Sequence, residues 1–251
     1  MDCVTDHGDV FFGYSGELRW KHLKLPYSST MYRGGETEPE IHRSLRNHQP
    51  PRMENGVLTW SPGHFGVRAQ WSALAEPIDV RLLTTDDGFV DWRCTHPYAA
   101  AKISLANGRQ LNGKGYAEYL QMSLKPWKLP IDELRWGRFL SEHHHLVWID
   151  WKSDSPKRWL FHNGVQREVA VIDDDQLILD KDNIILSLND RQVIREGAVI
   201  SSAFGKLPFP SLRLPLRQLN AYECKWRSWG TLRQNGMVIA EGWAIHEVVK
   251  L

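Results

Sequence analysis

The chain has 251 residues, which is enough for one large all-β domain or for two smaller ones. Its 31 basic residues nearly balance its 30 acidic residues, and this balance excludes a broad electrostatic surface for nucleic acid or an anionic membrane. Three widely separated cysteines fit neither a disulfide framework nor the spacing of a zinc site, so they favour a reducing compartment.

Two sequence features indicate where in the cell the protein is located: its first residues and the length of its apolar runs. Residues 1–7 contain neither a basic start nor an apolar stretch of signal-peptide length. No run approaches the roughly twenty apolar residues that a membrane helix needs. We therefore expect a cytoplasmic protein with no integral membrane segment and no nucleic-acid partner, and leave the oligomeric state open.

Most of the chain has the pattern of short β-strands separated by tight turns. The polar stretch 33–52 is an exception, and we expect a long loop or a partly helical excursion there. Asn-Gly pairs, which are typical of two-residue hairpins, occur near residues 55, 107, 163 and 235. Alternating or apolar runs predict strands in the second half at 146–152, 169–172, 177–179 and 184–188.

The stretch 123–133 divides the chain. It contains Pro126 and Pro130, so it cannot form a central strand, and we expect it to link a domain at 1–122 to a domain at 134–251. Two short echoes support two halves, because Leu18-Arg19-Trp20 recurs as Leu134-Arg135-Trp136 and Gly115-Tyr116-Ala117-Glu118 as Gly242-Trp243-Ala244-Ile245. The expected fold class is all-β, with two tandem antiparallel β-barrel or sandwich domains.

Twelve tryptophans are many for this length. Each can fill a core, but a dozen together favour at least one aromatic-lined pocket, because the indole is large and carries a polar N–H group. A pocket with many aromatic and few charged residues suits a hydrophobic small molecule as substrate.

Six motifs in order along the chain resemble one known family. They are Gly13-Tyr14, Leu18-Arg19-Trp20, Tyr27-Ser28-Ser29, Trp92-Arg93-Cys94-Thr95-His96-Pro97, Gly113-Lys114-Gly115-Tyr116-Ala117-Glu118 and Leu134-Arg135-Trp136-Gly137-Arg138-Phe139. This set, over about residues 10 to 160, resembles the lipocalin-like carotenoid 1,2-hydratases (hydroxyneurosporene synthases) and their AttH-like and Diels-Alderase relatives.

The resemblance implies two tandem lipocalin-like domains and a cofactor-free reaction on a terpenoid, carotenoid or polyketide. Two positions depart from the family pattern. Glu118 stands where the hydratases usually carry aspartate, and Tyr98 stands where many members carry a basic residue. The family includes hydratases of acyclic carotenoids and fungal pericyclases, so the resemblance bears more on the fold than on the reaction.

The candidate site centres on Glu118. In a strand, Tyr116 and Glu118 point to the same face, so the phenol and the carboxyl can meet one ligand. We expect an apolar pocket to keep Glu118 protonated, so that it donates a proton to an alkene while the faces of Trp92 and Tyr116 stabilise the cation. His96 is a candidate to hydrogen-bond the acid or polarise water. Further expected substrate-binding residues are Tyr14, Tyr27, Trp136 and Trp148.

The same acid would serve hydration, cyclisation or isomerisation, which makes the enzyme a hydratase (lyase) or a cyclase or isomerase. The alternatives stay open: Glu118 as a solvent-facing carboxylate, Tyr116 as a core residue and His96 as a structural histidine. At the level of the protein, the alternatives are a non-catalytic carrier of hydrophobic molecules, a shape-driven pericyclase and a structural module with a filled barrel.

The run His143-His144-His145 is the strongest metal candidate. In a strand only His143 and His145 would share a face, and no third ligand stands at a recognisable spacing, so we expect no metal site. Gly113-Lys114-Gly115 lacks the following helix and Ser/Thr of a phosphate loop, and there is no Gly-x-Ser-x-Gly nucleophile motif. We expect no cofactor.

Overall fold

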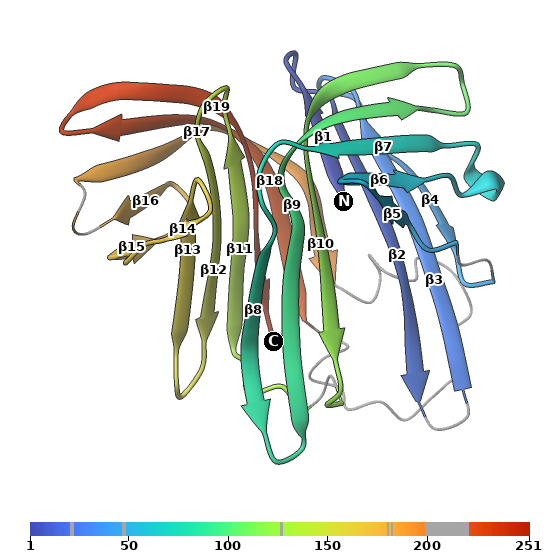
Figure 1. Ribbon diagram of the computed structural model, residues 1–251, viewed down its shortest axis with the longest axis horizontal. Helices are drawn as coiled ribbons and strands as arrows, with labels where there is room; N and C mark the ends of the chain where they lie inside the picture. The colour runs from blue at the N-terminus through green and yellow to red at the C-terminus, as the bar shows by residue number, and fades with distance from the viewer. Residues whose placement is uncertain (21–22, 47–48, 126–127, 180, 182, 199–220) are drawn as a thin grey trace. The chain divides into compact units, whose positions relative to one another are not determined.

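The computed structural model describes residues 1–20, 23–46, 49–125, 128–179, 181, 183–198 and 221–251. The fold is all-β, as the sequence predicts, and the only helical element among the described residues is the 3-10 turn Gly63–Phe65. Two curled antiparallel sheets follow each other along the chain, as in tandem lipocalin-like domains, the first running from blue to green and the second to red in Figure 1.

Among the described residues, ten strands form the first sheet and nine form the second. The first sheet consists of β1 (Asp2–Thr5), β2 (Val10–Trp20), β3 (Leu23–Arg33), β4 (Glu40–Ser44), β5 (Arg52–Glu54), β6 (Val57–Trp60), β7 (Arg68–Ala73), β8 (Ile78–Thr85), β9 (Gly88–Ser104) and β10 (Gln110–Met122). The second sheet consists of β11 (Glu133–Leu140), β12 (His145–Lys152), β13 (Lys157–His162), β14 (Val165–Gln166), β15 (Val171–Ile172), β16 (Gln176–Leu179), β17 (Ile184–Ala198), β18 (Tyr222–Gln234) and β19 (Met237–Lys250).

The order of the strands explains why the sheets curl. The second sheet has the order β14-β13-β12-β11-β19-β18-β17-β16-β15, so its two edge strands follow each other in the chain. Residues 167–170 join them, and a link of that length spans at most about 17 Å. The edges therefore lie near each other, and Arg158 on β13 donates from Nη1 to the carbonyl of Ala170 beside β15 at 3.1 Å.

The first sheet repeats this order as β4-β3-β2-β1-β10-β9-β7-β6-β5, with β8 added beside β9. One glycine in each sheet marks the same place in the repeat. A Cβ atom on Gly113 would lie 2.1 Å from the carbonyl oxygen of Val4, and one on Gly242 would lie 2.2 Å from that of Leu140. Each glycine thus lets two backbones approach closely at the same place in the two sheets.

The structural repeat corrects the echoes seen in the sequence. In the structure Gly242 is the counterpart of Gly113, whereas the sequence echo had matched Gly242 with Gly115, two residues further along. With the structural match, Glu247 is the counterpart of Glu118. The echo of Leu18-Arg19-Trp20 in Leu134-Arg135-Trp136 is not structural, because the former lies in β2 and the latter in β11, the counterpart of β1.

Each sheet encloses its own core cluster. The first core cluster consists of Cys3, Phe11, Tyr32, Leu58, Trp60, Val67, Ala69, Trp71, Ala99, Ala101, Ile103, Leu111 and Ala117. The second core cluster consists of Phe139, Leu146, Trp148, Leu160, Ile172, Leu177, Leu179, Ile184, Leu186, Leu188, Leu232 and Ala244. Several tryptophans are thus core fillers, and all three cysteines are buried thiols rather than disulfides.

The chain divides into two compact units, residues 1–80 with 91–120 and residues 81–90 with 121–251. The tip of the β8–β9 hairpin belongs to the second unit, where Leu82 accepts a hydrogen bond from Lys157 Nζ at 3.2 Å. The linker at 123–133 stays a prediction; its Pro126 and Trp127 lie outside the described residues, and β11 begins at Glu133.

The turns and the loop predicted from the sequence can be compared with the structure. The Asn-Gly pairs at 55, 163 and 235 form turns in which both residues have positive φ, which are the hairpin turns that this dipeptide favours. In the stretch 33–52, the described residues include strand β4 rather than a helix. Among the described residues, no helix is long and apolar enough to span a membrane.

Candidate functional site

Strands β9 and β10 are neighbours in the first sheet and carry the central residues of the candidate site. Ala117 on β10 belongs to the first core cluster, so its neighbours Tyr116 and Glu118 lie on the opposite face of the sheet. Tyr116 is paired with Asp2 on β1, and both are buried. Trp92 on β9 is also buried, with 3% of its surface exposed.

The structure brings Trp92, Tyr116 and Glu118 together. The Trp92 indole donates from Nε1 to Glu118 Oε2 at 2.5 Å, and the Tyr116 hydroxyl donates to the same oxygen at 2.7 Å. Two donors on one oxygen fix the orientation of the carboxyl group. Among the described residues, no hydrogen bond joins Glu118 Oε1 to the protein, so this oxygen is the one available to a ligand.

The surroundings of Glu118 differ from the sequence expectation. We expected an apolar pocket to enclose this carboxyl, but the Glu118 side chain is exposed while both of its donors are buried. The two buried donors hold the carboxyl but do not enclose it. Any exclusion of water from Glu118 must therefore come from what binds over it.

The buried thiol of Cys94 lies within hydrogen-bond distance of the Tyr116 phenol. Cys94 lies two residues from Trp92 and has no exposed surface. Burial raises the pKa of the Cys94 thiol well above its usual range, although the hydrogen bond with Tyr116 opposes this shift, and a raised pKa disfavours the nucleophilic thiolate. Burial also raises the pKa of Tyr116 well above its usual range, so the phenol stays protonated and can donate its hydrogen bond to Glu118. The sequence analysis assigned Cys94 no role.

His96 does not meet Glu118 in this structure. Its Nδ1 lies 3.1 Å from Thr95 Oγ1 and its Nε2 lies 3.2 Å from the carbonyl of Gly56. The ring is completely buried, and burial lowers its pKa. A neutral histidine with both nitrogens bonded to the protein matches the structural alternative, and a catalytic role for His96 stays a prediction without geometric support.

The expected substrate-binding residues fall into two groups. Tyr14 on β2 stacks on Phe12 with ring centroids 6.3 Å apart, and Tyr27 on β3 donates to Ser29 Oγ at 3.0 Å. Strand β1 separates β2 from the site strand β10. Trp136 and Trp148 belong to the second unit, where Trp148 is part of the second core cluster. Their contact with a substrate stays a prediction.

The counterpart of Glu118 in the second sheet, Glu247, has a different environment that the sequence analysis missed. Its Oε2 accepts a hydrogen bond from Lys225 Nζ at 2.5 Å, and Lys225 is itself buried and lies 5.6 Å from the centre of the Trp136 ring. Burial raises the pKa of Glu247, although the Lys225 ammonium opposes this shift. An ammonium thus occupies the place that two neutral donors take beside Glu118.

No group of three or more His, Cys, Asp or Glu side chains within the described ranges is arranged to hold a metal ion. The residues around Glu118 offer one carboxyl, one phenol, one indole and one thiol. This set can orient a carboxyl, donate hydrogen bonds to it and transfer a proton.

Comparisons with known proteins give only distant likenesses. No protein-family model matches the sequence, and no curated protein matches it. A structure of a candidate AttH from Nitrosomonas europaea is 10% identical with a TM-score of 0.49, over 98% of this chain and 89% of that one. The structures of CghA with Sch210972 and of CghA alone are each 9% identical, with TM-scores of 0.46 and 0.45, over 98% of this chain and 71% of theirs.

Proposed function

We propose that this protein is a cofactor-free enzyme that protonates an alkene in a hydrophobic terpenoid, carotenoid or polyketide, with Glu118 as the acid. The observation that carries this proposal is the convergence of the Trp92 N–H and the Tyr116 O–H on a single oxygen of Glu118. Two donors on one oxygen hold the carboxyl in a single orientation, which suits a group that transfers a proton to a bound substrate.

In this proposal each oxygen of Glu118 has its own task. Oε2 accepts both hydrogen bonds, so in the acid form the proton resides on Oε1, which faces the ligand. Transfer of this proton to one alkene carbon leaves a cation on the other carbon and a carboxylate on Glu118. The two donors then stabilise the carboxylate, whereas the ring faces of Trp92 and Tyr116 are buried and do not reach the cation as the sequence analysis expected.

Three outcomes share that first step. In a hydration, water adds to the cation and loses a proton. In a cyclisation, a second alkene of the same molecule captures the cation, and the new cation so formed loses a proton. In an isomerisation, the first cation loses a proton from a neighbouring carbon. In each case the proton released at the end restores Glu118 directly or through solvent, so the cycle needs no cofactor.

The exposure of Glu118 favours a long apolar substrate. A chain that covers the carboxyl excludes water and strengthens the electrostatic interactions in the site. Each buried methylene contributes about 0.8 kcal/mol, so such a substrate binds with few polar contacts. The substrate therefore supplies the apolar surroundings that the protein alone does not provide.

The test replaces Glu118 with glutamine, which keeps the size of the side chain and removes the transferable proton. Purified protein is incubated with a panel of acyclic carotenoids, terpenoids and polyene polyketides, and products are identified by mass spectrometry. We expect Glu118→Gln to lower turnover by roughly a hundredfold or more while binding is retained. Glu76→Gln, a change at an exposed position in the same unit, is the control and should leave turnover unchanged. Native turnover in Glu118→Gln would refute the proposal.

The same exposure of Glu118 favours one second candidate, a carrier of hydrophobic molecules. In a carrier, Oε1 would accept a hydrogen bond from a hydroxyl of the bound molecule, and no chemical change would follow. Recovery of each bound compound unchanged, with weaker binding in Glu118→Gln, would support the carrier over the enzyme.

A further inference from the structure

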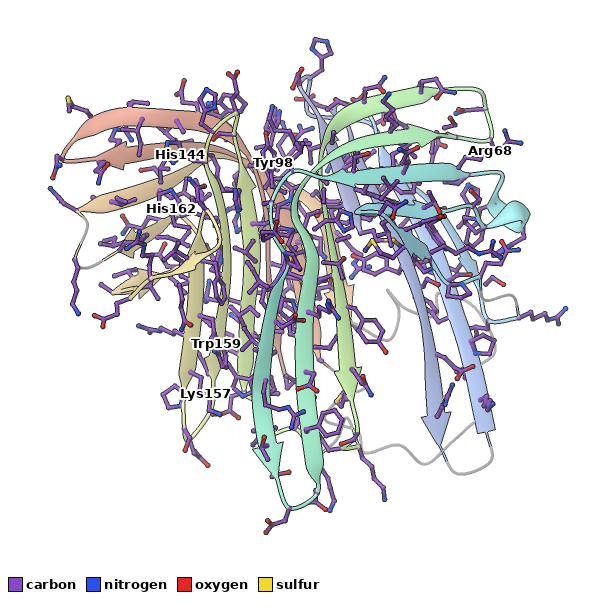
Figure 2. The ribbon with its side chains drawn as sticks, viewed as in Figure 1. Arg68, Tyr98, His144, Lys157, Trp159 and His162 are labelled. Carbon is purple, nitrogen blue, oxygen red and sulfur yellow. The ribbon has the colours of Figure 1, made fainter. Side chains whose placement is uncertain are left out.

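Two histidines of the second sheet face each other outside the candidate site. His144 precedes β12 and His162 ends β13, and both are half-buried and labelled in Figure 2. His144 Nδ1 lies 3.0 Å from His162 Nε2, and the rings are stacked with centroids 5.2 Å apart. The sequence analysis considered His143 with His145 instead, but β12 begins at His145, so the alternation of a strand does not extend to His143.

The backbone around this pair is held in place. The Ser141 hydroxyl donates to the carbonyl of His144 at 2.8 Å and accepts from its N–H at 3.0 Å. Asn163 accepts from the N–H of His145 through Oδ1 at 2.9 Å and donates to the carbonyl of His143 at 3.3 Å. His162 is paired with Leu146 on β12 and with Val165 on β14. The loop and the hairpin that carry the two rings are therefore tied to each other on both sides.

The distance between the two nitrogens can be compared with the distance between two ligands of one metal ion. A divalent metal binds imidazole nitrogen at about 2.1 Å, so two ligands at right angles bring their nitrogens to about 3.0 Å, whereas tetrahedral ligands require about 3.4 Å. The observed 3.0 Å is the usual length of a hydrogen bond between two imidazoles, and it is also the separation of adjacent ligands in square-planar or octahedral coordination.

We propose that His144 and His162 chelate a divalent cation of the copper or nickel type. Without the metal, one imidazole donates a hydrogen to the other; with it, that proton moves to the outer ring nitrogen and both inner nitrogens bind the ion. Water completes the coordination, since no described group of three ligands is present. The ion would join the β11–β12 loop to the end of the β13 strand, and this role is independent of the function proposed for Glu118.

The test uses the full chain without an affinity tag, after treatment with a chelator. Ni²⁺ and Cu²⁺ are titrated calorimetrically into the native protein, His144→Gln and His162→Gln. The control is His143→Gln, which removes an imidazole from the same loop at a side chain that is 80% exposed. We expect each of the first two variants to bind at least about tenfold more weakly and the control to bind as the native protein does.

Electron paramagnetic resonance of the Cu²⁺ complex gives a second measurement. We expect hyperfine structure from two imidazole nitrogens in the native protein and from one in His144→Gln, and an increase in melting temperature with metal that the variant lacks. Far-ultraviolet circular dichroism confirms that the variants fold. Equal binding by native protein and His144→Gln, or loss of binding in His143→Gln, would overturn the proposal.

Discussion

The phenol of Tyr116 allows the proposed acid to be tested without altering the acid. Tyr116→Phe removes one of the two donors to Glu118 Oε2 and keeps the buried ring. A hydrogen bond to a charged group is worth about 1.5–3 kcal/mol, so loss of a donor that stabilises the carboxylate should slow turnover roughly tenfold or more. The measurement is turnover of the substrate found with the panel.

Tyr119→Phe is the matched control, because it removes the hydroxyl of an exposed tyrosine on the same strand, β10. It should leave turnover close to the native value. A Tyr116→Phe variant that folds normally and reacts at the native rate would show that the second hydrogen bond has no part in the reaction.

The central residues of the site were within reach of sequence reasoning, but their surroundings were not. The i, i+2 spacing of Tyr116 and Glu118 fixes their common face, whereas Trp92 became a candidate through the motif that resembles the hydratases. The exposure of Glu118 depends on which strands and loops end nearby, and no local pattern encodes that. The partners of His96 could not be predicted for a similar reason, because they include the carbonyl of Gly56, forty residues away.

At the scale of strands, the glycines that mark the repeat allow a paired test. Gly113→Ala and Gly242→Ala would each place a methyl group within about 2.2 Å of a backbone carbonyl, which cannot move as a flexible side chain can. We expect each to lower the free energy of unfolding by about 1–3 kcal/mol or more. Urea unfolding followed by tryptophan fluorescence measures the change.

Gly16→Ala is the control for both glycines. Gly16 also lies in a strand, but no atom lies within 4 Å of the position a Cβ would take, so this change should cost little. If Gly113→Ala and Gly16→Ala had the same stability, close packing of the backbones at Gly113 would not be the reason for glycine there.

The turns were predictable because they depend on neighbouring residues, whereas the pairing of strands depends on residues that are far apart in the chain. Asn163 and Gly164 adopt positive φ because these two residues tolerate it, and the dipeptide alone indicates the turn. Asn107-Gly108 looks the same in sequence, but only Gly108 has positive φ there, since this hairpin closes between Leu105 and Arg109. The polar sequence of β4 conceals a strand whose residues are all partly or fully exposed.

For the whole molecule, the sequence pattern of short strands and turns was sufficient to predict two antiparallel β-domains. It did not reveal that the second sheet encloses polar groups as well as its core cluster. His246 on β19 is 3% exposed; its Nε2 lies 2.8 Å from Ser228 Oγ, and its ring stacks on Trp226 at 5.1 Å. Apolar periodicity alone would predict an aliphatic residue at such a position.

This buried imidazole couples stability to pH. Burial lowers the pKa of His246 to about 3, and the nearby Arg135 and Arg191 lower it as well, while Asp174 opposes them. In the unfolded chain the pKa is about 6.5, so below that pH the unfolded state binds a proton that the folded state does not. The stability that His246 contributes is therefore complete above pH 6.5 and is lost as the pH falls from 6.5 toward 3.

Between pH 7.5 and pH 5, one such histidine should lower the free energy of unfolding by about 2 kcal/mol. We expect the urea midpoint of the native protein to fall over this range by more than that of His246→Gln, which has no proton to bind at this position. His7→Gln, at an exposed position, should keep the native dependence on pH. If His246→Gln lost as much stability as the native protein between these two pH values, or if nuclear magnetic resonance showed the His246 ring titrating near 6.5 in the folded state, burial of a neutral imidazole would not account for the sensitivity of this protein to acid.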